Sequence, residues 1–268
     1  MVEEREPILM VVTGQKKVGK TYATTQMIDP YMQGNPSMGE KGRKVLIYDA
    51  NMEYENIKAI GLENLRRFTM QKRVECRKVE PRNEDGSIAK VDGMMSIMST
   101  ILERYAGGML ILEDINRYLI GTQTQDIIGT LATNRHRDLD IIIHLQSLAA
   151  VTTRMWQNCS VIRMHKQQDN IDTYKDRIPY YEQLKIAEIL VNTQYINGNR
   201  RFYCYVSSEE QYIRGEFTKD ALLKACKEYV ELYSKELNIR MKRHGKGAEA
   251  RLTTINEMAN ELLKKYHQ

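Results

Sequence analysis

The sequence has no run of about 18 or more apolar residues, the length that a membrane-spanning helix requires. Its longest apolar stretches, Ile8–Val12, Met109–Leu112 and Ile141–Ile143, have the length of β-strands. The N-terminus, Met-Val-Glu-Glu-Arg-Glu, is charged and acidic, and no apolar signal-peptide region follows it. We therefore expect no stable membrane insertion and a cytoplasmic location.

Cysteine is also scarce, with only four residues, and the four are far apart in the chain. There is no CxxC pair and no His/Cys cluster with the spacing of metal ligands. This pattern excludes a disulfide framework and a structural zinc site, and it indicates reduced thiols.

The charge excess is small. Forty Lys and Arg residues against 35 Asp and Glu give a net charge of +5, which permits contact with nucleic acid without requiring it. At 268 residues, the chain has room for one large α/β domain or for one domain with an appendage.

Short apolar runs alternate with helical patterns over the first two thirds of the chain. We expect strands at 8–13, 44–49, 109–113, 140–146 and 160–164. Helices are expected at 20–31, 55–61, 92–105 and 123–137, and 66–90 has the composition of an irregular or hairpin insertion. Strands separated by helices predict a doubly wound, mostly parallel α/β sheet with ligands at the carboxyl ends of its strands.

The clearest motif lies between the first expected strand and the first expected helix. Gly14 to Thr21 matches GxxxxGK[ST] at every fixed position. The two glycines permit backbone angles that a side chain would forbid, and the loop N–H groups and the helix N-terminus would bind a β-phosphate. Lys20 would reach the β- and γ-phosphates, and the Thr21 hydroxyl would hold Mg²⁺. The sequence therefore predicts a P-loop that binds ATP and Mg²⁺.

The residues predicted to bind the nucleotide are Gly14, Gln15, Lys16, Lys17, Val18, Gly19, Lys20, Thr21 and Tyr22. For Lys16 and Lys17, a place in a solvated loop is the alternative.

Paired acids, Glu113 and Asp114, end the third expected strand. In such a pair, one carboxylate supports the Mg²⁺ shell through water and the other polarises the attacking water as general base. We assign Glu113 to the metal and Asp114 to the base; because such ATPases usually carry Asp then Glu, the reverse assignment stays open. Gln146, at the end of the fourth strand, is expected to sense the γ-phosphate or orient water, with a surface glutamine as the alternative.

Two arginines close the helix before the fourth strand. Arg135, ahead of Arg137, is a candidate arginine finger that would act in the site of a neighbouring copy. The alternative is a basic last turn, which the helix dipole favours in any case. We expect His136 and His144 to be structural.

Together these segments resemble the FtsK/HerA superfamily of ring-forming DNA motors. Beyond the P-loop, the resemblance depends on Val45–Asp49 followed by Glu53-Tyr54, on the paired acids, on Gln146 with Arg135 upstream, and on Arg154–Met164. It covers about residues 8–166. The small size is most like viral genome-packaging ATPases.

That resemblance implies a homo-oligomeric ring of five or six subunits that pumps double-stranded DNA into a capsid, with a portal or capsid protein as a further partner and the host cytoplasm as its location. A phage assembly ATPase of the zonula occludens toxin type is an alternative, although such proteins usually carry a membrane segment.

A P-loop also occurs in proteins with other functions. A small-molecule kinase would need a lid with arginines, for which Arg200, Arg201 or Arg214 are the candidates. A GTPase is disfavoured because no Asn-Lys-x-Asp motif is present and the third strand is not followed by Asp-x-x-Gly. The intact acids and Gln146 argue against a binding protein without catalysis.

The expected organisation has three parts. Residues 1–168 form the P-loop ATPase core, and 169–237 continue it with helices at about 171–192 and 218–237 and a hairpin at 201–216. Residues 238–268 hold a basic, flexible link and a last helix from about 253.

Overall fold

The computed structural model describes residues 6–83, 85–115, 129, 134–207 and 209–267. They divide into two compact units. The first unit comprises the chain up to Thr13 together with Gly19–Ser160, and the second comprises Gly14–Val18 together with Val161–Gln268. Each unit has its own strands and its own buried apolar residues.

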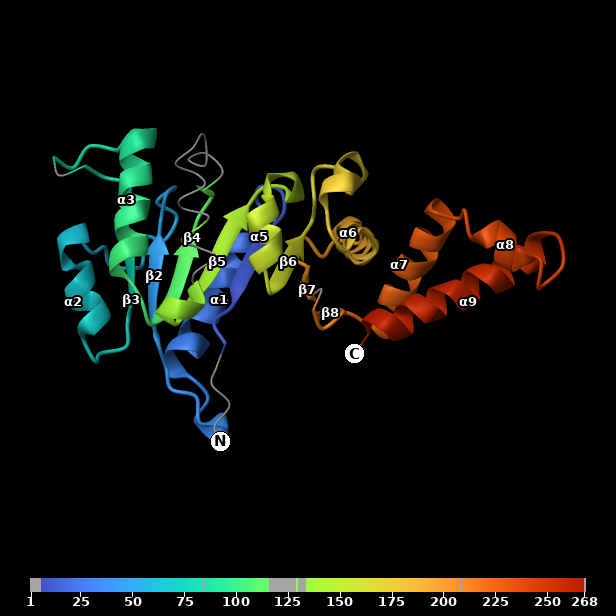
Figure 1. Cartoon of the computed structure of the whole chain (residues 1–268), viewed down its shortest axis with the longest axis horizontal. Coiled ribbons are helices and arrows are strands. Elements are labelled where there is room, and N and C mark those ends of the chain that lie inside the picture. Colours follow the sequence, from blue (N-terminus) through green and yellow to red (C-terminus); the bar gives the residue numbers. More distant parts are fainter. Residues whose placement is uncertain (1–5, 84, 116–128, 130–133, 208, 268) are drawn as a thin grey trace. The chain divides into compact units, whose positions relative to one another are not determined.

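The first unit is built on five parallel strands. Their order is β3-β2-β4-β5-β1, and Figure 1 shows β2, β4 and β5 side by side. The strands are β1 Leu9–Thr13, β2 Lys44–Tyr48, β3 Cys76–Val79, β4 Gly108–Leu112 and β5 Leu139–Leu145. Strands β1, β4 and β5 are buried along their whole length, as expected for a parallel sheet covered on both faces. The predicted α/β class is confirmed.

Helices connect these strands. They are α1 Lys20–Gln33, α2 Leu65–Met70, α3 Val91–Arg104 and α5 Thr153–Asn158. In α3, Met98, Ile101 and Leu102 recur at helical spacing and are buried, which explains why this segment forms an amphipathic helix. The short α5 begins at a Thr152 cap, whose hydroxyl accepts a hydrogen bond from the Met155 amide at 3.3 Å.

In the second unit, three antiparallel strands pack against a long helix. The strands are β6 Val161–His165, β7 Tyr203–Ser207 and β8 Tyr212–Gly215, and the helix is α6 Tyr181–Ile196. The side-chain amide of Gln183 joins the two layers because its Nε2 donates to the carbonyls of Ser207 and Tyr212, each at 2.9 Å. The predicted β-hairpin is present, formed by β7 and β8.

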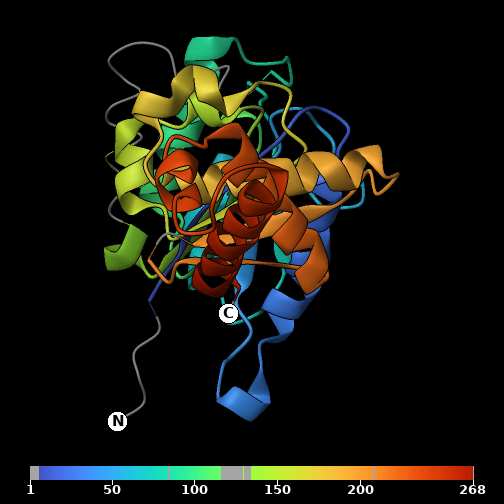
Figure 2. The ribbon, with the colours of Figure 1, turned by 90° about the vertical axis from the view of Figure 1, so that its right-hand side faces the viewer.

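Three helices, α7 Lys219–Leu232, α8 Leu237–Met241 and α9 Ala248–Tyr266, end the chain, and α7 and α9 lie side by side (Figures 1 and 2). Helix α9 is tied to α6 by Glu182, which accepts from Lys265 Nζ at 3.0 Å and from the Tyr266 hydroxyl at 2.6 Å. No helix in the described parts of the chain is both long and apolar enough to cross a bilayer.

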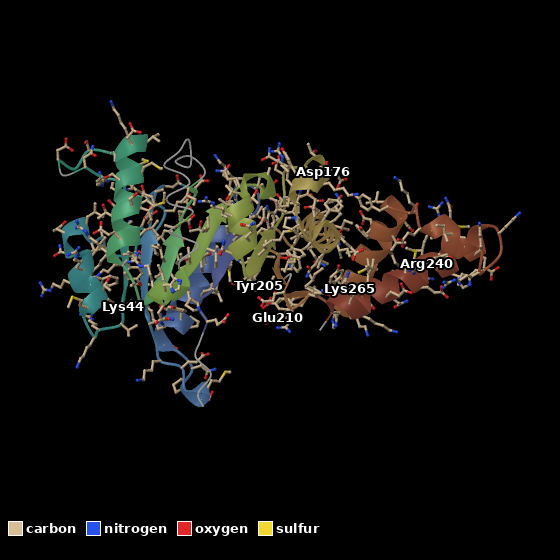
Figure 3. The ribbon with its side chains drawn as sticks, in the orientation of Figure 1. Lys44, Asp176, Tyr205, Glu210, Arg240 and Lys265 are labelled. Carbon is tan, nitrogen blue, oxygen red and sulfur yellow. The ribbon has the colours of Figure 1, made fainter. Side chains whose placement is uncertain are left out.

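The expected flexible link at 238–250 is wrong. Leu237 begins α8 and is buried with Val230 and Ile255. Arg240, labelled in Figure 3, also pairs with Glu261 of α9 at 2.7 Å. Arg240 therefore lies on α8, where Glu261 balances its charge, and the other basic residues lie in the short turn that leads into α9.

Before β4, one further expectation is wrong and another is confirmed in part. The short helix expected at 55–61 lies instead at 65–70, as α2. The stretch 66–90 contains α2 and the edge strand β3, and a turn closed by a bridge between Arg82 and Ile88. The helix expected at 123–137 falls mostly outside the described residues; of it, Asn134–Arg137 form a 3₁₀ turn.

Candidate active site

The phosphate-loop motif has the predicted local context, because the chain runs from β1 through Gly14–Val18 into α1. Gly14 has φ 147°, and a Cβ there would lie 2.7 Å from the His165 Cβ, so glycine is required at this position. The Gln15 amide donates to the Lys166 carbonyl at 2.9 Å. Within the second unit, the start of the loop is therefore fixed against the end of β6.

Lys16 and Lys17 are exposed, and Lys17 has φ 64°, in the left-handed region. Exposure fits both roles considered for these lysines, a nucleotide contact and a solvated loop.

The first turn of α1 belongs to the first unit and carries the two motif residues that act through side chains. Gly19 caps the helix with φ 85°, and Lys20 and Thr21 follow it. The Thr21 hydroxyl donates to Glu53 Oε2 at 3.0 Å. Tyr22 is 52% exposed. A carboxylate from the loop after β2 thus lies beside the hydroxyl that the sequence assigns to Mg²⁺.

The loop after β2 is organised by Asp49, which is completely buried. Its Oδ1 accepts from the Glu53 amide at 2.8 Å, and its Oδ2 accepts from the Tyr54 amide at 3.1 Å and from Lys78 Nζ at 3.2 Å. Met52 within the loop has φ 55°. A non-glycine residue in this region costs free energy and persists where surrounding contacts impose it, so the loop has a fixed shape that presents Glu53 and Tyr54.

Glu113 follows β4 and is 4% exposed. The Tyr54 hydroxyl donates to its Oε1 at 2.5 Å, and His144 Nδ1 lies 2.9 Å from its Oε2. Burial by itself would raise the pKa of this carboxyl. His144 and Tyr54, with a further electrostatic contribution from Lys20, outweigh burial and bring the pKa of Glu113 below its ordinary value. The carboxylate is therefore ionised at neutral pH.

The same contacts reach back to α1. His144, on β5, has its Nε2 2.7 Å from the hydroxyl of Thr24, which lies three residues after Thr21. Burial, reinforced by the nearby Glu113 carboxylate, raises the pKa of Tyr54 well above its ordinary value, so Tyr54 stays a hydrogen-bond donor. The buried contacts connect the first turns of α1 to the carboxyl ends of β2, β4 and β5.

Asp114 and Gln146 form a second pair at this edge of the sheet. Gln146 Nε2 donates to both carboxylate oxygens of Asp114, at 3.0 and 2.8 Å. Asp114 has φ 46°, a left-handed conformation that Asp tolerates better than most residues. The amide holds a half-buried carboxylate next to Glu113 in the chain, which is an arrangement suited to orienting a water molecule.

The two candidate finger arginines lie in the 3₁₀ turn Asn134–Arg137. The side chain of Arg135 lies outside the described residues. Arg137 Nη2 donates to the carbonyls of Glu103 and Tyr105, at 2.8 and 3.0 Å, where α3 ends. Burial lowers the pKa of Arg137 against the opposing effect of Glu103. Since Tyr105 precedes β4, Arg137 lies at the amino edge of the sheet, at the opposite end of β4 from Glu113.

Within the described part of the chain, no three His, Cys, Asp or Glu side chains are grouped so that they could hold a metal alone. This fits Mg²⁺, which usually binds one or two carboxylates together with the phosphates of a substrate. Thr21 and the carboxylates near it are oxygen donors of the kind that Mg²⁺ prefers.

Sequence reasoning missed three contributors to this site. Glu53 and Tyr54 entered only as part of a resemblance, without a contact to Thr21 or Glu113. His144 was expected to be structural, and the structure places it against the Glu113 carboxylate. The signal for the first two was a Glu-Tyr pair four residues after a strand-ending Asp.

No protein-family model and no curated protein matches the sequence. Among solved structures, the chain is similar to the genome packaging NTPase B204 from Sulfolobus turreted icosahedral virus 2 in complex with AMP. The TM-score is 0.50 at 14% identity, covering 80% of this chain and 99% of that one. The same NTPase with sulfate gives a TM-score of 0.49 at 16% identity, covering 78% and 95%. The N-terminal domain of zonular occludens toxin from Neisseria meningitidis gives 0.37 at 14% identity, covering 61% and 79%. At these identities the likeness is one of fold alone, and this chain is similar in fold to the B204 protein.

Proposed function

We propose that this protein hydrolyses ATP and uses the free energy to move double-stranded DNA, as a ring of five or six copies that packages a viral genome. The enzymatic part of this proposal is supported by side chains that converge on the first turn of α1. Lys20 and Thr21 lie on the first turn of α1, where the Thr21 hydroxyl donates to Glu53 at 3.0 Å. Lys20 also acts electrostatically on Glu113, adding to the larger effects of His144 and Tyr54 that lower the pKa of this carboxyl against burial. This places an ammonium group and a hydroxyl beside carboxylates, the donor set that a magnesium nucleotide requires.

Each residue then has a role. Gly14–Val18 and Gly19 bind phosphate oxygens through their amides, and Lys20 pairs with the β- and γ-phosphates. When bound, Mg²⁺ neutralises charge on the phosphates. Thr21 would hold the ion directly, and Glu113 would accept hydrogen bonds from water bound to it.

Asp114 serves as the general base for the attacking water, and Gln146 orients the water and the Asp114 carboxylate. The hydrogen bonds from Gln146 to Asp114 support this assignment of roles. They connect the catalytic carboxylate to a neutral amide that can sense whether a γ-phosphate is bound. Glu113, whose two oxygens already contact Tyr54 and His144, is the less mobile of the two acids.

The proposal that the polymer is DNA is supported by the fold and by charge. The similar solved protein is described as a genome packaging NTPase. The chain itself has a net charge of +5. The turn before α9 presents Lys242, Arg243 and Lys246 to solvent, where cations can neutralise phosphates of a duplex.

The decisive experiment measures ATP hydrolysis with and without double-stranded DNA, together with the mass of the assembled particle. We expect DNA to stimulate hydrolysis and the particle to have the mass of five or six chains. Lys20→Ala should abolish both ATP binding and turnover, because it removes the charge that binds the phosphates. Turnover by Lys20→Ala at the normal rate would refute the site, and phosphate transfer to a small acceptor without any response to DNA would favour a kinase.

A further inference from the structure

We infer that Glu53 supplies a carboxylate oxygen to the magnesium ion of the nucleotide, alongside Thr21. The inference rests on the proposed ATPase function and adds to it a metal-binding residue that the P-loop and the acids after β4 do not include. It starts from a single contact, the 3.0 Å between Thr21 Oγ1 and Glu53 Oε2.

The spacing of these two oxygens suits a shared ion. In an octahedral Mg²⁺ site with bonds of about 2.0–2.1 Å, neighbouring oxygen ligands lie about 2.9 Å apart. Thr21 Oγ1 and Glu53 Oε2 are already separated by nearly that distance. An ion held by the Thr21 hydroxyl would therefore meet the Glu53 carboxylate without rearrangement of either backbone.

Glu53 is held in this position by the loop that carries it. The buried Asp49 carboxylate accepts from the Glu53 amide at 2.8 Å and is itself paired with Lys78 at 3.2 Å. The left-handed Met52 turns the chain just before Glu53. This is the arrangement expected of a metal ligand, because outer contacts that fix a ligand reduce the entropy lost when the ion binds.

The other acids at this edge are more heavily engaged. Both oxygens of Glu113 contact buried side chains, and both oxygens of Asp114 accept from Gln146. Glu53, in contrast, is exposed, and the hydroxyl of Thr21 is its side-chain partner among the described residues. Of the three carboxylates, Glu53 is the one that can turn an oxygen to a cation at the least cost in broken contacts.

A purely structural role is the competing explanation. A carboxylate near the first turn of a helix is stabilising through the helix dipole, whether or not a metal binds there. The two roles differ in what they affect: a structural Glu53 would influence stability or nucleotide binding in general, and a metal ligand would influence the affinity for the ion specifically.

The test uses Mn²⁺, a paramagnetic substitute for Mg²⁺, with the full chain and ATPγS. The Mn²⁺ affinity of the complex is measured by electron paramagnetic resonance for the wild type, Glu53→Gln and the matched control Glu55→Gln. Glu55 is an exposed glutamate two residues further along, so the control makes the same change of charge. ATPγS affinity is measured in parallel with EDTA present.

We expect Glu53→Gln to weaken Mn²⁺ binding about 10- to 100-fold, the range seen when supporting groups of a metal site are removed. Glu55→Gln should remain within about twofold of the wild type, and ATPγS affinity in EDTA should be equal for all three. Equal Mn²⁺ affinity in Glu53→Gln and Glu55→Gln would overturn the inference and leave the ATPase proposal standing. A wild type that binds no ATPγS at all would overturn both.

Discussion

Replacing Tyr54 by Phe isolates one hydrogen bond of the site without changing the packing around it. The hydroxyl of Tyr54 donates to Glu113 Oε1 at 2.5 Å, and both side chains are buried. Phe has the same ring, so the variant removes an oxygen atom and leaves no large cavity. A hydrogen bond to a charged group contributes about 1.5–3 kcal/mol, and we expect Tyr54→Phe to lower the free energy of unfolding by about 2 kcal/mol at pH 7.

The effect should depend on pH in a defined direction. The pKa of Glu113 is depressed in the folded protein, so its contribution to stability is present above the unfolded pKa of about 4.3 and is lost as the pH falls through the folded value. Removing the Tyr54 hydroxyl lets the pKa of Glu113 rise. The stability difference between Tyr54→Phe and the wild type should therefore be largest near neutrality and should shrink below about pH 4.

The assay is urea unfolding followed by fluorescence. Trp156 is the single tryptophan of the chain and lies in α5, so its emission reports on the first unit. A double-mutant cycle with Glu113→Leu separates the hydrogen bond from other effects of each change. We expect a coupling energy of about 1.5–3 kcal/mol. A value below about 0.5 kcal/mol would refute the claim that Tyr54 stabilises the Glu113 carboxylate.

Two further predictions concern the neighbouring copy and the second unit. If Arg135 acts in trans, Arg135→Ala and Glu113→Gln should each lose turnover, by about 10³-fold for the arginine, while both still bind ATP. In an equal mixture, about a quarter of interfaces would join an intact acid to an intact arginine and recover activity; no recovery would count against the finger. In the second unit, Asp172 accepts from Tyr181 and Tyr233 and pairs with Lys185, and although burial opposes them, these contacts lower its pKa to about 2. Its side chain is 39% exposed, so after discounting for solvent screening we expect Asp172→Asn to cost about 1 kcal/mol at pH 7. That difference should diminish between about pH 4 and pH 2 in unfolding curves followed by circular dichroism, and a difference independent of pH would contradict the assignment.

Most of the parallel sheet could be predicted because its strands are buried on both faces and read as continuous apolar runs. Ile141–Ile143 and Met109–Leu112 are examples. The edge strand β3 could not be predicted, because its sequence, Cys-Arg-Lys-Val, contains no apolar run. Lys78 is tolerated there since it pairs with Asp49 at 3.2 Å and with Glu80 at 2.9 Å, and those contacts are invisible in a hydrophobic pattern.

Some residues of the candidate site could likewise be predicted from the sequence, and others could not. Gly14 to Thr21 and the paired acids could be found because each is a local motif with a chemical reason for its spacing. His144 could not, because in the sequence it is one polar residue inside an apolar strand, and its partners Thr24 and Glu113 are 120 and 31 positions away. Its contact with Glu113 follows from β4 and β5 being neighbours in the sheet, which pairing and not composition determines.

Polar side chains gather at both the amino ends and the carboxyl ends of the five parallel strands, here called the amino and carboxyl edges. The difference between these two edges indicates which one is the site. At the amino edge, Asp140 accepts from the Ile8 amide at 2.9 Å and from the Tyr31 hydroxyl at 2.6 Å, and Arg137 donates to carbonyls at the end of α3. Asp140 also lies 3.7 Å from Arg43, so the charges at this edge are matched by an opposite charge, by backbone groups or by neutral side chains. At the carboxyl edge, Glu53 and Glu113 instead approach one helix turn that carries Lys20. Burial opposes the charge of Glu113, and the proposed cation would add to the stabilisation that His144, Tyr54 and Lys20 already give that charge. We therefore base the proposed magnesium nucleotide at this edge on the contacts of these carboxylates as well as on the P-loop motif.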